Sequence, residues 1–143
     1  MASIALAGCG GGGQGSSAPQ PTTEVVNGMT VPLAPDTATN NRTVSGIDSD
    51  SDGIRDDVQR AMATQFGSTH TKIELLKTFA RTEQAVLNNP TPQAVGAYMR
   101  SIGCTSLTAA ETDKLTGTLL NTPERSAAYR NAMAGATWTG EEC

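Results

Sequence analysis

The chain has 143 residues, enough for one domain with short extensions. Its net charge of −4 is local, because residues 48–57 hold five acids and one arginine while the remainder carries nine acids and nine bases. This balance excludes a basic surface for nucleic acid, and an aromatic content of 3% leaves little material for a surface that stacks sugars or bases.

The first residues are typical of a targeting signal. A short apolar stretch leads into Leu6-Ala7-Gly8-Cys9, which resembles the lipobox of bacterial lipoproteins. In that family a signal peptidase cuts before the cysteine, which is then acylated. The resemblance implies lipidation of Cys9, with residues 1–8 as a truncated signal peptide because no basic segment precedes the apolar one.

Residues 9–43 are predicted to be a lipid-anchored flexible linker. Glycine and serine dominate its first part, proline, threonine and asparagine its second, with at most a short extended segment at Thr30–Leu33. In the lipoprotein sorting pattern, the absence of aspartate after the cysteine favours the outer over the inner membrane. We therefore expect a lipid-anchored protein of the bacterial cell envelope, with its domain in the periplasm or at the surface.

The most informative stretch runs from Asp48 to Gln59. Acids alternate at Asp48, Asp50 and Asp52, and Gly53 follows where a sharp turn requires a positive φ. Alternate side chains of a tight loop point inward, so the carboxylates are expected to converge on a hard cation, with Ca²⁺ (calcium) the expected one. The alternative is an acidic loop that caps the next helix. Mutual repulsion of five acids in ten positions favours the cation.

This stretch resembles the EF-hand loop and the calcium loops of bacterial dockerins and thrombospondin type 3 repeats. The resemblance implies a backbone carbonyl ligand from the residue after the glycine and a water-mediated ligand at the ninth position. It departs from an EF-hand at the twelfth position, where glutamine replaces a bidentate glutamate, and in having no predicted helix before the loop. We expect weak binding, or completion by Asp57 or a distant group. The predicted ligands are Asp48, Asp50, Asp52, Ile54, Asp56 and Gln59.

Beyond the loop, hydrophobic residues recur at helical spacing. The first helix is marked by Ile54, Val58, Met62 and Phe66 and ends at Gly67. Later helices are predicted from about 69 to 88, from Thr91-Pro92 to Gly103, after the capping box Thr108–Glu111, and from Thr122-Pro123 to about 136. No segment alternates as a strand. We expect an all-α domain at residues 44–143, a small bundle of about five short helices preceded by the linker and the loop.

The three cysteines fit an exported protein if one of them is lipidated. Cys104 and Cys143 then remain, and an oxidising compartment would join them in a disulfide. Closing a loop of about 40 residues stabilises by roughly 3–4 kcal/mol in the chain-entropy estimate. The alternative, a nucleophilic cysteine with His70 as its base, has no supporting motif.

Three hypotheses for function follow. The first is a non-enzymatic envelope lipoprotein whose calcium is structural and whose helical surface contacts another envelope or surface component. The second is a calcium-responsive sensor or adhesion module. The third, disfavoured, is an envelope hydrolase that uses Asp56 and Asp57. The sequence lacks a Ser-His-Asp set, a zinc-type histidine cluster and a phosphate-binding glycine loop within the domain, so we expect no enzymatic activity.

Overall fold

The computed structural model describes residues 22–136, which form six helices and one antiparallel pair of strands. The elements, in chain order, are β1 (Thr23–Val26), β2 (Met29–Pro32), α1 (Thr37–Asn40), α2 (Asp56–Gln65), α3 (Ile73–Asn88), α4 (Pro92–Gly103), α5 (Ala109–Leu119) and α6 (Pro123–Met133). The protein is predominantly helical, as expected. The small sheet and α1 correct the expectation of a purely α-helical fold of five helices.

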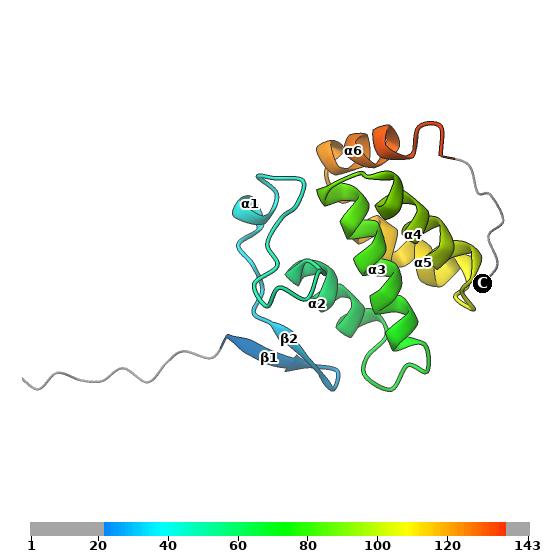
Figure 1. Cartoon of the computed structure of the whole chain (residues 1–143). Helices are drawn as coiled ribbons and strands as arrows, with labels where there is room; N and C mark the ends of the chain where they lie inside the picture. Colours follow the sequence, from blue (N-terminus) through cyan, green and yellow to red (C-terminus); the bar gives the residue numbers. More distant parts are fainter. Residues whose placement is uncertain (1–21, 137–143) are drawn as a thin grey trace, which may run out of the picture.

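Helix α3, the longest, occupies the middle of the molecule (Figure 1). Helices α4 and α5 lie on one side of it, α2 and the hairpin on the other, and α6 lies across one end. Contacts join α3 to each of α4, α5 and α6, and join α2 to α5 and to both strands. No described helix is long and apolar enough to cross a membrane.

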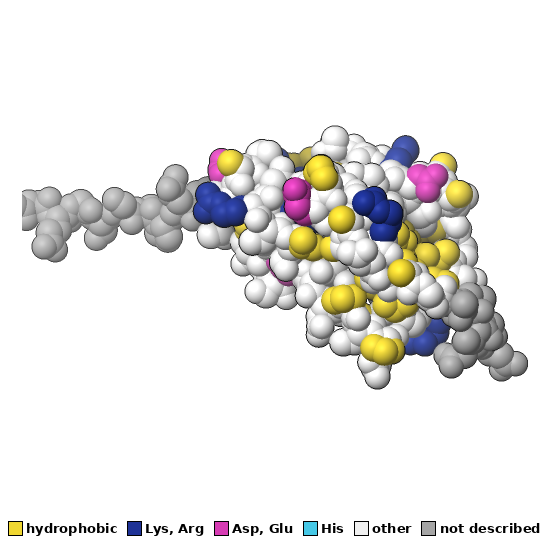
Figure 2. Space-filling model, turned by 90° about the horizontal axis from the view of Figure 1, so that it is seen from above, with side chains coloured by type: hydrophobic (Ala, Val, Ile, Leu, Met, Phe, Trp, Pro, Cys, Tyr) yellow, Lys and Arg dark blue, Asp and Glu magenta, His cyan; other side chains and the backbone are white. Residues whose placement is uncertain are grey.

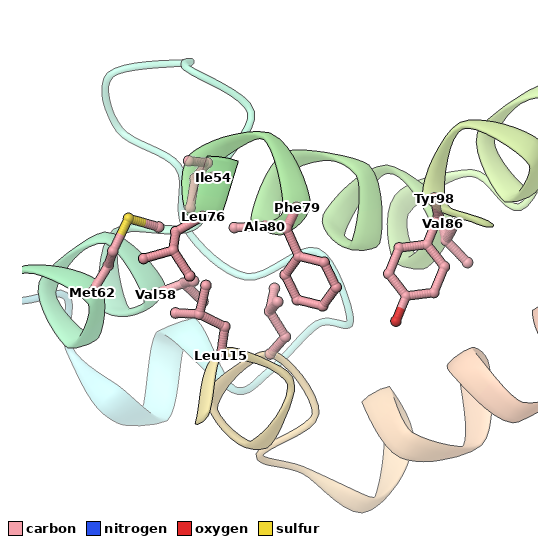
Figure 3. Packing of buried hydrophobic residues seen from close by; sticks show 10 residues of the cluster. Ile54, Val58, Met62, Leu76, Phe79, Ala80, Val86, Tyr98 and Leu115 are labelled. Atoms are coloured by element: carbon pink, nitrogen blue, oxygen red, sulfur yellow. The ribbon is translucent and has the colours of Figure 1, made fainter. Parts of the chain in front are cut away.

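The hydrophobic core lies where α2, α3 and α5 meet. Val58 and Met62 of α2 follow the expected spacing of four, and Ile54 before them is also buried. Figure 3 shows this row facing α3, with Leu115 of α5 beneath. Burying a side chain of this size stabilises the fold by roughly 1.5–3 kcal/mol. The core residues are Ile54, Val58, Met62, Leu76, Phe79, Ala80, Val86, Tyr98, Leu115 and Leu119.

Threonine caps begin the last three helices, as the sequence predicts. The Thr91 side chain accepts from the Ala94 N–H, with Pro92 as the first residue of α4. Thr108 and Glu111 form both bonds of a capping box at α5, and the Thr122 hydroxyl accepts from the Arg125 N–H at α6. Each cap satisfies a backbone N–H that the helix leaves unpaired.

The hairpin β1–β2 and α1 lie within the residues predicted to be linker. Asn27 and Gly28 connect the strands with φ values of 46° and 80°, the signs that a two-residue turn matched to strand twist requires. The Asn27 amide donates to the Ala63 carbonyl of α2 at 3.2 Å. Arg60 of α2 pairs with Glu24 and donates to the Pro32 carbonyl, so the hairpin is bonded to α2 from both strands.

Candidate metal centre

Two acids of the loop between α1 and α2 converge with the first residue of α2. Asp48, Asp50 and Asp56 each offer a carboxylate oxygen, and these oxygens lie within 4.8 Å of one another. Oxygens bound to one Ca²⁺ at about 2.3–2.6 Å can lie up to about 5 Å apart, so this spacing fits a shared cation. Asp56 is buried, Asp48 is half-buried and Asp50 is exposed, which leaves the cluster open on one side.

Backbone N–H groups hold this arrangement. The Asp48 carboxylate accepts from the Asp52 and Gly53 N–H groups at 3.2 and 3.0 Å, and Asp56 accepts from the Ser49 N–H at 2.9 Å. Gly53 has a φ of +85°, as the loop pattern predicts, and Ser51 adopts +58°, a conformation uncommon for a residue with a Cβ. The turn therefore brings Asp48 and Asp56 to the same point, although eight positions separate them.

The carboxylates also crowd one another. Burial, followed by its hydrogen bond to Asp50 and the charge of Asp52, raises the pKa of Asp48, although the Gly53 and Asp52 N–H groups act in the opposite direction. A cation among the acids would reverse this effect, because an opposite charge favours the ionised carboxylate.

Asp52, also predicted as a ligand, lies outside the cluster. Its Oδ1 accepts from the Ile54 N–H at 2.8 Å, and its Oδ2 pairs with the Arg81 guanidinium of α3 at 3.2 Å. The Arg81 Nε donates to the Asp52 backbone carbonyl at 2.8 Å. Arg81 therefore ties the loop to α3, a role that the sequence did not signal because the two residues are 29 positions apart.

The two remaining predicted ligands close the base of the loop. The Gln59 side chain is buried and its amide nitrogen contacts Asp50 and the Ile54 carbonyl. The Gln59 amide nitrogen therefore lies between Asp50 and the Ile54 carbonyl, and ligation of a cation by Ile54 or Gln59 stays a prediction.

Asp57 belongs to a different group. Its carboxylate pairs with the Arg55 guanidinium at 2.6 Å and accepts from the Asn121 amide. Asp56 and Asp57, the pair considered for hydrolysis, therefore bond to different partners. Because these contacts occupy its carboxylate, Asp57 is not placed to replace the glutamate that an EF-hand has at the twelfth position.

Two buried arginines, absent from the predicted site, anchor the loop to the helices. Arg55 donates to the Thr118 and Leu119 carbonyls at the end of α5, at 3.0 and 3.3 Å. Arg125 of α6 donates to the carbonyls of Asn40, Thr43 and Val44, just before the loop. Burial, followed by the charge of Arg55, lowers the pKa of Arg125. Their acceptors are mostly backbone carbonyls, which leave no pattern in a sequence.

A cavity of about 340 Å³ opens beside the loop, between the hairpin and α3. Asp50, Asp52 and Gln59 line one wall, and Glu74 and Lys77, which pair with each other at 2.8 Å, line another. Met29, Ile54, Met62 and Ile73 supply its apolar surface. The sequence predicted only a short extended segment at Thr30–Leu33, which overlaps β2, and neither the hairpin nor the cavity that it covers was expected.

Cys104 takes part in a disulfide bond. Cys9 and Cys143 both lie outside the described residues, as do residues 1–8, so the pairing of Cys104 with Cys143 and the lipidation of Cys9 stay predictions.

No protein-family model, curated protein or solved structure matches this chain.

Proposed function

We propose that the chain is a non-enzymatic lipoprotein of the bacterial envelope whose loop Asp48–Gln59 binds Ca²⁺ as a structural ion. The convergence of Asp48, Asp50 and Asp56 carries the calcium part of this proposal. The ligand types support it, because calcium prefers carboxylate and carbonyl oxygens and tolerates irregular geometry.

The position of the loop supports a structural role for the ion. Asp56 is the first residue of α2, and Ile54, two positions earlier, belongs to the core. A cation held by Asp48, Asp50 and Asp56 would link the segment entering the domain to the start of α2. It would also remove the repulsion among the carboxylates. Calcium bound here would therefore stabilise the folded chain more than the unfolded one.

A thermal melt in chelator and in millimolar calcium tests this role. An extracellular-type Kd of roughly 10⁻⁴–10⁻³ M predicts a gain on the order of 1 kcal/mol, or a few degrees in Tm. Asp50→Ala should abolish the shift while the helical circular dichroism signal persists. Asp113→Ala, at an exposed position of α5, removes the same charge from a helix that contributes no carboxylate to the cluster and should keep the shift.

Equal midpoints with and without calcium would reduce the loop to a helix cap. An unfolded calcium-free chain would instead make the ion an obligate partner of folding. Magnesium should shift the midpoint less, because it demands a tighter octahedron than this open cluster offers.

The lipid anchor is a separate part of the proposal and rests on the sequence Leu6-Ala7-Gly8-Cys9 and the glycine-rich stretch after it. With a complete signal sequence upstream, the protein should partition into detergent and incorporate labelled fatty acid. Cys9→Ser should release it into the aqueous phase. A wild-type protein that never acquires the label would refute the anchor and leave the calcium site untouched.

Contact with another envelope component would use the helical surface. Among the described residues, four large hydrophobic side chains are exposed, and two of them, Leu75 of α3 and Ile102 of α4, lie on helices. Figure 2 shows hydrophobic and polar atoms interspersed over one face of the molecule, with charged side chains between them. Such a mixed surface suits a reversible contact better than an obligate one.

The cavity beside the loop favours a second candidate function, a calcium-responsive sensor or adhesion module. Its volume falls within the range of small-ligand sites, and its wall includes Asp50 and Gln59. Calcium at the loop would change the charge of that wall. Hydrogen exchange compared with and without calcium distinguishes the two functions. Protection gained only at residues 48–59 indicates a structural ion, and protection that extends to β2 and α3 indicates a responsive site.

A further inference from the structure

A buried acid occupies the core, away from the loop. Glu83 of α3 is fully buried, and its Oε2 accepts from the Thr116 hydroxyl of α5 at 3.0 Å. Its Oε1 has no hydrogen-bond partner among the described residues. A buried polar oxygen without a partner costs roughly 1–3 kcal/mol, and more when it is charged.

The surroundings of Glu83 offer no compensating charge. None of the lysines, arginines or the histidine within residues 22–136 forms an ion pair with it. Thr116 faces it from α5. From α4 the Tyr98 hydroxyl lies near enough for the charge of Glu83 to raise the pKa of Tyr98, and that hydroxyl bonds to Tyr129 of α6 at 3.1 Å. Among residues 22–136, the groups that face Glu83 from α4, α5 and α6 are therefore hydroxyls that are neutral at physiological pH.

We propose that Glu83 is a proton-dependent latch between α3 and α5, closed when its carboxyl is neutral and loosened when the carboxyl ionises. The physical reason is the apolar setting. A neutral carboxyl can stay in this buried position near Tyr98, whereas a carboxylate there needs water or a cation. Thr116 is its one hydrogen-bond contact with α5, so hydration of the carboxylate separates α5 from α3 at that point.

The electrostatics agree in direction with the geometry. Burial raises the pKa of Glu83 from 4.5 to about 7, although the Thr116 hydrogen bond acts to lower it. Below pH 4.5 the carboxyl is mostly neutral in both the folded and the unfolded chain, so folding buries no charge at this position. As pH rises through 7 the unfolded chain is already ionised and the folded chain must follow, so stability falls. The folding equilibrium constant should drop roughly 10²-fold between pH 4.5 and 9 from this group alone.

Urea unfolding of the full oxidised chain in chelator, at pH 5, 7 and 9, measures this loss. Other groups titrate as well, so the decisive quantity is the ratio of the folding constants of wild type and Glu83→Gln. This ratio should fall about 10²-fold from pH 5 to 9. Hydrogen exchange, corrected for intrinsic rates, should show α5 amides losing protection at high pH in the wild type but not in Glu83→Gln, with α2 as the internal reference.

A carbon-13 titration of the Glu83 carboxyl in the wild type provides a second measurement that needs no variant. A midpoint near 7 supports the latch, and a midpoint near 4.5 overturns it. Equal pH dependence in wild type and Glu83→Gln also overturns it. Loss of stability with α5 and α2 losing protection equally would show a cost spread over the core, which contradicts a latch.

Discussion

The side-chain nitrogen of Gln59 donates to both carboxylate oxygens of Asp50, at 3.2 and 3.3 Å. An amide N–H₂ therefore stands where an EF-hand presents a glutamate, and it satisfies Asp50 without a cation. For the proposed calcium site, this contact predicts a loop that keeps its structure at low calcium and binds the ion with limited affinity.

Gln59→Glu should lower the stability of the calcium-free protein and raise its affinity for calcium. Without calcium, the new carboxylate faces Asp50 and should lower Tm in chelator. With calcium, it adds a charged ligand and should tighten Kd by roughly tenfold. Calorimetric titration and paired melts measure the two effects. A variant with unchanged affinity would show that the amide does not face the ion.

Asp52→Asn should weaken calcium binding less than Asp50→Asn does. The Asp52 carboxylate is engaged by the Ile54 N–H and by Arg81, whereas Asp50 belongs to the converging cluster. The two substitutions remove the same charge from neighbouring positions, so each serves as the control for the other. An equal loss of affinity would mean that Asp52 leaves Arg81 and turns to the ion.

Gly46→Ala should destabilise the protein by roughly 2–4 kcal/mol. Gly46 has a φ of +66°, and a Cβ there would lie 2.1 Å from Arg55 Cδ and 2.8 Å from Arg125 Nη2. Gly117→Ala is the matched control, since its Cβ would meet nothing within 4 Å in α5. It should stabilise by roughly 0.5–1 kcal/mol. Urea unfolding gives both values, and a neutral Gly46→Ala would show that the two arginines can move.

Arg125→Met should release the segment before the loop. The substitution leaves the carbonyls of Asn40, Thr43 and Val44 without their buried donor, at a cost of roughly 2–5 kcal/mol. Trypsin should then cleave after Arg42 faster than in the wild type. Arg125→Lys should give an intermediate rate, because one ammonium cannot reach all the acceptors. Resistance equal to wild type would show that other contacts hold the segment.

The five longer helices were predictable because each sequence carries a hydrophobic spacing, a threonine cap or both. Val58 and Met62 gave the spacing of four, and Thr108 with Glu111 gave a cap. The hairpin was missed although Asn27-Gly28 is a strong turn signal. Its strands are only four residues long and β1 is mostly exposed, so they carry no alternation of hydrophobic and polar residues.

The candidate site was predictable in its acids but not in its support. Spacing alone indicated that Asp48 and Asp50 would converge. Asp52 stays outside the cluster because its carboxylate pairs with Arg81 of α3. The segment before the loop is held by Arg125, which is 85 residues from its acceptor Asn40. Such pairs join a side chain to a distant partner that is often backbone, and no local pattern encodes them.

Arg55 gives the loop a dependence on the order of synthesis. Its guanidinium is buried against the Leu119 carbonyl, which follows it by 64 residues in the chain. At about 5–20 residues per second, Arg55 and its neighbouring acceptor Asp57 are made several seconds before the Thr118 and Leu119 carbonyls. During that interval the loop cannot complete its native burial, whatever the calcium concentration around it. The buried position of Arg55 can therefore form only after the last residues of α5 have been made.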